Sequence, residues 1–510
     1  MPADGFPIVL TADRTLMSRH RLLLDGMFVA SQTTAAPRAI VSRLFLPPAR
    51  HVGGRATVAP LGLRRLEAAL LRGDSPADSV ALADEAHLDQ VVGPQTRLIG
   101  LSGGEPAGFG MSSSTMTGVV GGTIYPQAEF VRLLTRVREL RAQRCPQARI
   151  VFGGPGAWQL SADDGLRREL GIDHVVTGYA ESAIASLAKS LLAGDALPAV
   201  IESACPRPEG IPPILGESTM GAIEISRGCG LGCDFCTLGG LGMMHLPRET
   251  ILADAETNLR AGQPNLSLLS EDLLRFGATG TNCEPEAMLA LLRELRALPA
   301  LRLLQADHTN IASMAQYDDA ELQELHHLLG GGTQRFPWLN LGVETASGEL
   351  LARLGGRPKM KGTSPADWGE FCRQQLDRLI RLGYVPMVSL LVGAPQETQE
   401  DLQQTLQWVR DLRGQRVMVF PVIYAPLDAP QHNRPRLSAR HWQLMCESYE
   451  FNFRWVPVVY EDSMRAGGVG AGRRLAIQLL GQGNVLLWRW LLRKHMLRTA
   501  AREGHERGAS

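Results

Sequence analysis

At 510 residues the chain is too long for one ordinary domain, so we expect two or three folded units. Its 45% hydrophobic and 20% charged residues are typical of a soluble globular protein, and 52 basic residues balance 52 acidic ones. This balance argues against binding of nucleic acid or anionic membranes through bulk charge. The N-terminus shows no basic region followed by a long apolar core, so we expect no secretory signal and a cytoplasmic protein.

Residues 1–201 predict an α/β domain in which strands and helices alternate. The helix expected over 61–72 carries Leu63, Leu66 and Leu70 on one face. The other expected elements are strands over 39–45, 97–102, 148–153 and 174–177 and helices over 127–142 and 182–192. Such alternation is typical of a doubly wound parallel sheet of the flavodoxin-like or Rossmann-like type.

Three of these strands end in turns that contain glycine. The turns comprise Ser102, Gly103 and Gly104, then Gly153 and Gly154, then Thr177 and Gly178. In an open α/β sheet, ligands bind at the carboxyl ends of the strands, and glycine lets a bulky ligand approach the backbone closely. The turns therefore predict a cofactor crevice, with ordinary tight turns between strand and helix as the alternative.

Four prolines between 202 and 218 predict a linker, and a second domain is expected over 219–430. Its expected strands lie at 221–227, 264–272, 300–307, 338–344, 385–393 and 417–424, with helices at 285–297, 368–382 and 398–412. Six β/α units of this kind predict a partial barrel. Residues 431–510 predict a helical C-terminal cap, in which the apolar stretch 479–492 is too short and too polar for a transmembrane span.

Three of the eight cysteines, Cys229, Cys233 and Cys236, lie within eight residues on a glycine-rich loop after the first barrel strand. Three thiolates can hold three irons of a 4Fe-4S cubane, whereas a closed structural site normally takes four protein ligands. The fourth iron is then open to the amino and carboxylate groups of a cofactor. A zinc site with a remote fourth ligand is the alternative. The scattered positions of the other cysteines argue against a disulfide framework.

The spacing Cys-x3-Cys-x2-Cys, with Phe235 directly before the last cysteine, resembles the signature of the radical S-adenosylmethionine (SAM) superfamily. The resemblance implies that Cys229, Cys233 and Cys236 hold the cluster and that the cluster cleaves SAM. It also implies SAM contacts from Phe235, from Ser270 and Glu271 after the second strand, from Glu344 in the fourth and from Gly393 in the fifth. Glu344 could instead be a salt-bridge partner, and Glu397 with Thr398 could merely cap the next helix. The Glu271 carboxylate could also compete with SAM for the open iron.

An α/β domain ahead of such a barrel resembles the cobalamin-binding class of the superfamily. This resemblance implies cobalamin contacts from Ser102, Gly103, Gly104, Gly153, Gly154, Thr177, Gly178 and Glu181. Proteins that ligate cobalt from below use Asp-x-His-x-x-Gly, and here Ala49 replaces the aspartate that would orient His51. We therefore expect no protein histidine on cobalt. Arg55, Arg64 and Arg65 could approach the lower corrin face or lie in solvent.

These resemblances imply a cobalamin-dependent radical SAM C-methyltransferase that acts on a small-molecule, peptide or lipid substrate and takes electrons from a donor such as flavodoxin or ferredoxin. One alternative is a radical SAM cyclase or carbon–carbon bond-forming enzyme, with or without cobalamin. Another is polar methylation of an aromatic such as tryptophan by methylcobalamin. An iron–sulfur carrier or sensor is disfavoured, because the remaining cysteines form no second cluster. The sequence assigns neither the substrate nor any catalytic residue beyond these cofactor contacts.

Overall fold

The computed structural model describes residues 4–72, 76, 78–427 and 435–508. The chain forms two compact units. Unit 1 comprises Met1–Ser113, Gly122–Ile223 and Leu246–Leu266, and unit 2 comprises Ser114–Gly121, Glu224–His245 and Ser267–Ser510. The segment Leu246–Leu266, which follows the cysteine loop, therefore packs with the N-terminal sheet.

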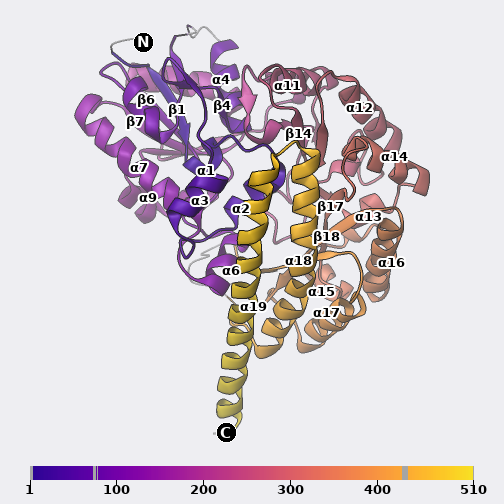
Figure 1. Cartoon of the computed structure of the whole chain (residues 1–510). Coiled ribbons are helices and arrows are strands. Elements are labelled where there is room, and N and C mark those ends of the chain that lie inside the picture. Colours follow the sequence, from indigo (N-terminus) through magenta and orange to yellow (C-terminus); the bar gives the residue numbers. More distant parts are fainter. Residues whose placement is uncertain (1–3, 73–75, 77, 428–434, 509–510) are drawn as a thin grey trace. The chain divides into compact units, whose positions relative to one another are not determined.

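Unit 1 is built on a parallel sheet of six strands in the order β5-β1-β6-β7-β8-β9 (Figure 1). The strands are β1 (Ile8–Ala12), β5 (Val80–Leu82), β6 (Leu98–Ser102), β7 (Arg149–Gly153), β8 (His174–Gly178) and β9 (Val200–Ser203). The strand order reverses between β1 and β6, and ligands of doubly wound sheets bind at the carboxyl ends on either side of such a reversal. The expected doubly wound sheet is confirmed.

Helices cover both faces of this sheet. One core contains side chains of α5 (Leu88–Val91), α7 (Tyr125–Arg144), α8 (Trp158–Ser161) and α9 (Asp164–Leu170), and the other contains those of α1 (Arg14–Met17), α4 (Leu61–Arg72) and α10 (Ile184–Ala193). The remaining elements are α2 (Leu23–Ala30), α3 (Arg38–Phe45), β2 (His51–Val52), β3 (Arg55–Ala56), β4 (Val58–Ala59), β10 (Glu217–Ser218), which pairs with β4, and α11 (Arg248–Arg260).

The strand expected over 39–45 is wrong, because this segment is helix α3. Its buried side chains Val41 and Phe45 are four residues apart, which is the spacing of one helix face. The first strand of the sheet is instead β1, whose five residues are all buried. A central parallel strand covered on both faces is a continuous apolar run without alternation, and so lacks the usual strand pattern.

The strands of the partial barrel occupy six positions, as expected. They are β11 (Ala222–Glu224) with β12 (Ser226–Arg227), β14 (Asn265–Leu269), β15 (Leu303–Ala306) with β16 (His308–Asn310), β17 (Trp338–Glu344), β18 (Val385–Val392) and β19 (Met418–Ile423). They form the sheets β11-β14-β15 and β16-β17-β18-β19. The intervening helices are α12 (Pro285–Ala297), α13 (Ile311–Met314), α14 (Asp319–Gly330), α15 (Gly348–Arg353), α16 (Trp368–Arg381) and α17 (Gln399–Asp411).

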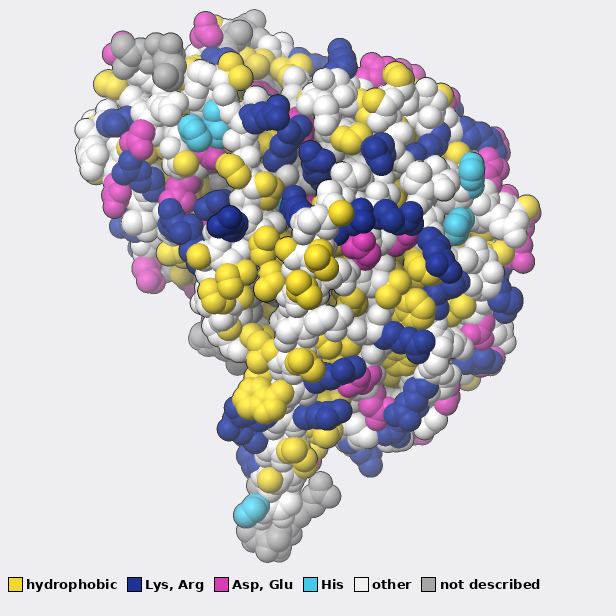
Figure 2. Space-filling view, in the orientation of Figure 1, with side chains coloured by type: hydrophobic (Ala, Val, Ile, Leu, Met, Phe, Trp, Pro, Cys, Tyr) yellow, Lys and Arg dark blue, Asp and Glu magenta, His cyan; other side chains and the backbone are white. Residues whose placement is uncertain are grey.

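Two long helices, α18 (Ala439–Ala466) and α19 (Ala471–Gly508), form the expected helical cap of unit 2 and lie side by side (Figure 1). Tyr449 stacks on Trp488, with ring centroids 5.0 Å apart. The outer face of α19 leaves several large apolar side chains exposed (Figure 2), namely Leu475, Leu479, Leu486, Trp490 and Leu497. In the described part of the chain, no helix combines the length and apolarity that a membrane crossing requires.

Arg64 and Arg65 on α4 are buried in unit 1, which corrects both expectations for them. Arg65 forms a two-pronged ion pair with Asp254 of α11, and its Nη1 also donates to the Pro212 carbonyl at 2.6 Å. Arg64 donates to the carbonyl oxygens of the neighbouring backbone. Both guanidinium groups therefore hold α4 within its own unit.

The substitution Arg65→Ala is expected to lower the free energy of unfolding by about 3–5 kcal/mol, because it leaves the Asp254 carboxylate buried without its counter-charge. Denaturant unfolding followed by circular dichroism measures the loss. Arg72→Ala, at an exposed position of the same helix, is the control and should change stability by less than about 0.5 kcal/mol. Equal stabilities of the two variants would contradict this role.

Candidate functional site

The three clustered cysteines lie on a loop whose backbone is shaped by glycine. Gly228, Gly230 and Gly232 all have positive φ, between 65° and 71°, which side chains rarely adopt. The loop turns back on itself, since the Gly230 amide donates to Leu241 O at 2.9 Å and the Gly232 amide donates to Gly239 O at 3.0 Å. From outside the loop, the Arg275 guanidinium donates to the Cys229 carbonyl at 2.8 Å.

The structure brings the three thiols together. Burial raises the pKa of Cys229, and it raises the pKa of Cys233 to about 11. Charge on Cys236 raises the pKa of both further, so the three thiols interact electrostatically. Thiols of this kind give up their protons when a metal binds, because only the thiolate is a good ligand.

Glu344 ends strand β17 next to this loop and is paired with Lys359. The pair is more than nine-tenths buried at both side chains. Burial alone would lower the pKa of Lys359, yet the Glu344 carboxylate, together with charge on Cys233, holds that pKa above its usual value. Glu344 has φ of 68°, at a shift in register between β17 and β18. The salt-bridge interpretation of Glu344 is confirmed.

The end of β14 supplies Ser270, Glu271 and Asp272. The hydroxyl of Ser270 lies 2.5 Å from that of Ser226 on β12. The Glu271 carboxylate keeps one buried oxygen, Oε2, without a hydrogen-bond partner, and burial raises its pKa. Asp272 accepts hydrogen bonds from Thr309, Asn310 and Ser313 and so fixes the start of α13. A buried carboxylate oxygen without a hydrogen-bond partner makes Glu271 a candidate to bind a ligand.

The two other expected SAM residues have different surroundings. Phe235 is half-buried within the cysteine loop. Gly393 ends β18 with φ of 74°, and its amide donates to Glu397 Oε2 at 3.1 Å. That same oxygen accepts from His441 at 2.7 Å, so Glu397 is a structural partner. Thr398 caps α17, as its alternative interpretation proposed.

The eight expected cobalamin residues lie at the carboxyl ends of β6, β7 and β8, which are adjacent in the sheet of unit 1. Ser102 pairs in register with Gly153, and Thr177 and Gly178 end β8 before the short helix Ala180–Ser182 (η2) that contains Glu181. A Cβ on Gly104 would meet nothing within 4 Å, so open space lies beside this turn. By contrast, Gly178 is explained by packing within the protein and gives no evidence of a ligand, because a Cβ there would collide with Ser203 O.

Sequence reasoning missed Asp13, which follows β1 at the reversal of the strand order. Its side chain is buried, and it caps α1 by accepting from the Thr15 amide at 2.8 Å. The apolar run Ile8–Ala12 followed by a capping aspartate was the signal that could have found it. Lys359 was not predicted from the sequence either, because no spacing or motif marks that residue.

Burial raises the pKa of Asp13 to about 6, whereas an unfolded chain gives about 3.9. The native state therefore holds more protons than the unfolded state between these values, and stability falls as the pH rises from about 4 to 6. Asp13→Asn keeps the capping oxygen but cannot titrate. It should therefore remove this loss of stability with rising pH, which amounts to about 2 kcal/mol. Denaturation of both proteins at pH 4.5 and 7 measures it. Identical pH dependence of the two proteins would rule the effect out.

No protein-family model matches the chain. Curated relatives are ribosomal protein uS12 methylthiotransferases, RimO. That of Oleidesulfovibrio alaskensis is 27% identical over 234 residues, which are 44% of this chain and 50% of that protein. That of Cereibacter sphaeroides is 27% identical over 228 residues, 43% of this chain and 46% of that protein. The chain thus matches about half the length of these relatives.

Among solved structures, the chain is similar to the radical SAM methyltransferase TsrM from Kitasatospora setae. The structure of TsrM with tryptophan and a SAM analogue superposes with a TM-score of 0.53 over 83% of this chain and 75% of that chain, at 15% identity. The structure of TsrM with cobalamin and a 4Fe-4S cluster gives a TM-score of 0.52 over 83% and 74%, also at 15% identity.

The likeness to TsrM covers most of the chain. The chain therefore has the fold of this radical SAM methyltransferase, and it is similar in sequence to the RimO methylthiotransferases over less than half of its length.

Proposed function

We propose that the protein is a cobalamin-dependent radical SAM methyltransferase that methylates a carbon atom of its substrate. The observation that carries this proposal is the glycine-shaped loop of Cys229, Cys233 and Cys236, on which charge on one thiol raises the pKa of the others. Three thiolates can hold three irons of a cubane and leave the fourth iron to a cofactor. When bound, the cluster supplies the electron that cleaves SAM, and cobalamin carries the methyl group.

The protein's own residues bind and orient these groups. Glu271, with its unpartnered oxygen beside the loop, is suited to accept from the SAM amino group. The Lys359 ammonium is suited to bind the SAM carboxylate or to hold Glu344 in place. Burial of these charges keeps water away, which strengthens each interaction and protects reactive species.

The turn at Gly104 supports a corrin in unit 1, because a large flat ligand needs open space beside the backbone at the edge of the sheet. His51 is turned toward Asp84 and His87 of its own unit, in keeping with the expectation that no histidine ligates cobalt. Among the residues described at the edge of the sheet, we assign the glycine turns after β6, β7 and β8 to cobalamin.

Gly104→Trp should therefore reduce cobalamin binding at least about tenfold while the iron content stays unchanged, because the indole fills the space that the corrin needs. Cobalt and iron analysis after reconstitution measures both. Gly62→Trp is a matched control, since Gly62 on α4 also faces open space in unit 1. Normal cobalamin uptake by the Gly104 variant would remove this turn from the site.

The likeness to TsrM, whose structure contains tryptophan, favours polar methylation of an aromatic substrate as a second candidate. The RimO relatives raise methylthio transfer as a further outcome. Incubation with methyl-labelled SAM, a reductant and candidate small molecules and peptides distinguishes these reactions by the mass of the product. Transfer of one labelled methyl carbon supports the proposal, and 5′-deoxyadenosine formed in equal amount marks the radical route. A product with added sulfur, or a ring closed without added carbon, would overturn it.

A further inference from the structure

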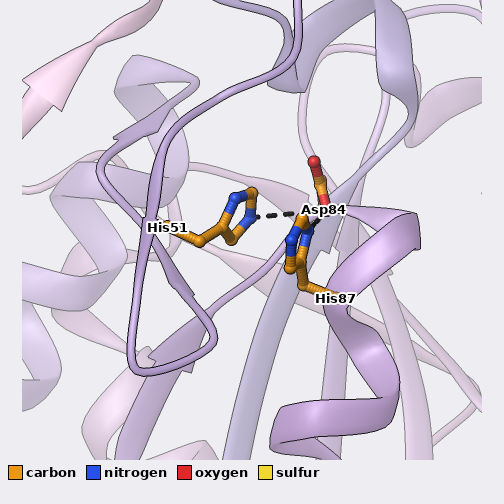
Figure 3. A group of neighbouring side chains, drawn as sticks. All are labelled: His51, Asp84 and His87. Carbon is orange, nitrogen blue, oxygen red and sulfur yellow. Dashed lines mark hydrogen bonds and ion pairs between the residues drawn. The ribbon is translucent and has the colours of Figure 1, made fainter.

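Three side chains of unit 1 converge outside the cysteine site. One ligand atom each of His51, Asp84 and His87 lies within 4.8 Å of the others, and Figure 3 shows the three groups directed toward one another. His51 belongs to β2, Asp84 follows β5, and His87 ends the short helix Glu85–His87 (η1). The group thus joins the β2–β3 hairpin to the carboxyl end of an edge strand.

The hydrogen bonds of His51 leave one nitrogen available. Its side chain is 8% exposed, and Nδ1 lies 3.1 Å from the Ala49 carbonyl oxygen. A carbonyl can only accept, so Nδ1 carries the proton and Nε2 of the neutral ring presents a lone pair. This buried nitrogen has no hydrogen-bond partner. The Ala49 carbonyl thereby fixes the ring as a second partner fixes a metal-binding histidine.

Nε2 of His51 faces an oxygen rather than a donor. Asp84 Oδ1 is 3.4 Å away, and the same oxygen lies 2.7 Å from Nδ1 of His87. The two imidazole rings are stacked, with centroids 3.5 Å apart, so two positive charges on them would repel. A lone pair and a carboxylate that face each other in a buried place are unfavourable unless a cation lies between them.

We propose that His51, Asp84 and His87 bind a divalent transition-metal cation such as Zn²⁺. Zinc takes imidazole nitrogen and carboxylate oxygen at about 2.0–2.2 Å, so two ligand atoms of a tetrahedral site lie about 3.3 Å apart. The 3.4 Å from His51 Nε2 to Asp84 Oδ1 agrees with this spacing. At His87 the cation replaces the proton that Nδ1 shares with Asp84, and that proton is released. The distance between His87 Nδ1 and Asp84 Oδ1 then increases by about 0.6 Å.

Such a cation has a structural consequence and an open position. It ties the β2–β3 hairpin to the turn after β5. A metal that binds only the folded state stabilises that state against unfolding. Three protein ligands leave the fourth position to water or a small anion. This site is separate from the cysteine loop, which belongs to unit 2, and it is independent of the methyl-transfer proposal.

The test uses the protein with its iron–sulfur cluster already assembled, so that the cysteines do not take up zinc. After incubation with Zn²⁺ and gel filtration over a weak chelator, zinc and iron are measured in the same sample. The wild type should retain about one zinc per chain, with iron unchanged. His51→Ala, His87→Ala and Asp84→Asn should each bind zinc at least about tenfold more weakly, because two ligands remain.

The matched control is His327→Ala, which removes an exposed histidine of unit 2 and should leave zinc binding unchanged. Asp84→Asn is nearly isosteric, and circular dichroism and iron content show that each variant is folded. Absence of retained zinc in the wild type overturns the proposal. Equal retention by the wild type and the three site variants overturns it too, since the zinc is then bound elsewhere.

Discussion

Replacing Cys233 with alanine is expected to lower the iron content after anaerobic reconstitution from about four atoms per chain to below one and to abolish SAM turnover. The remaining Cys229 and Cys236 can hold only two corners of a cubane, and a cluster held at two corners is lost. Burial raises the pKa of the Cys233 thiol to about 11, so binding of iron would have to displace its proton. Iron and sulfide analysis, with chromatography of SAM and its products, measures both effects.

Cys446→Ala is the control for this prediction. Cys446 lies on α18 and is likewise partly buried, with its pKa raised to about 11 by burial, but it belongs to no group of cysteines. Its loss should leave iron content and SAM turnover within about twofold of the wild type. If Cys233→Ala behaved like Cys446→Ala, the cysteine loop would not hold the cluster.

The second large effect is expected at Lys359. Lys359→Met leaves Glu344 buried without its counter-charge, which costs about 3–5 kcal/mol of stability. SAM turnover should also fall by about 10- to 100-fold, because a charge-assisted hydrogen bond contributes about 1.5–3 kcal/mol. Lys361→Met removes a neighbouring lysine that donates to Thr281 and Asn282 and has no carboxylate partner among the described residues, so stability and SAM turnover should both stay close to the wild type.

A double variant separates the two roles of the pair. Lys359→Met with Glu344→Met removes both charges together, so most of the lost stability should return. SAM turnover should stay low, because Lys359, which we assign to the SAM carboxylate, is absent from both variants. Recovery of turnover together with stability would mean that the pair serves the fold alone.

The parts of the fold that follow from the sequence are those with local signals. The helix over Leu61–Arg72 was predicted at its observed bounds, because its apolar residues recur at helical spacing. The cysteine loop was equally clear, since three closely spaced thiols on a glycine-rich loop have few structural uses. By contrast, Arg38–Phe45 has a strand-like composition but packs as a helix, and tertiary packing decided the outcome.

The parts that could not be predicted depend on partners distant in sequence. Arg65 meets Asp254, and Glu344 meets Lys359 beyond helix α15, and no sequence motif marks either pair. The grouping of His51 with Asp84 and His87 likewise arises because a hairpin folds over the end of β5. Such pairs are set by the path of the chain in three dimensions, which residue spacing does not encode.

The central claim is that one chain holds both an iron–sulfur cluster and a corrin. It is tested most directly by anaerobic reconstitution with iron, sulfide and hydroxocobalamin, followed by gel filtration, visible spectroscopy and metal analysis. We expect about four irons and one cobalt per chain, with a corrin absorption band that remains with the protein. Iron bound at full occupancy without any retained corrin would contradict it.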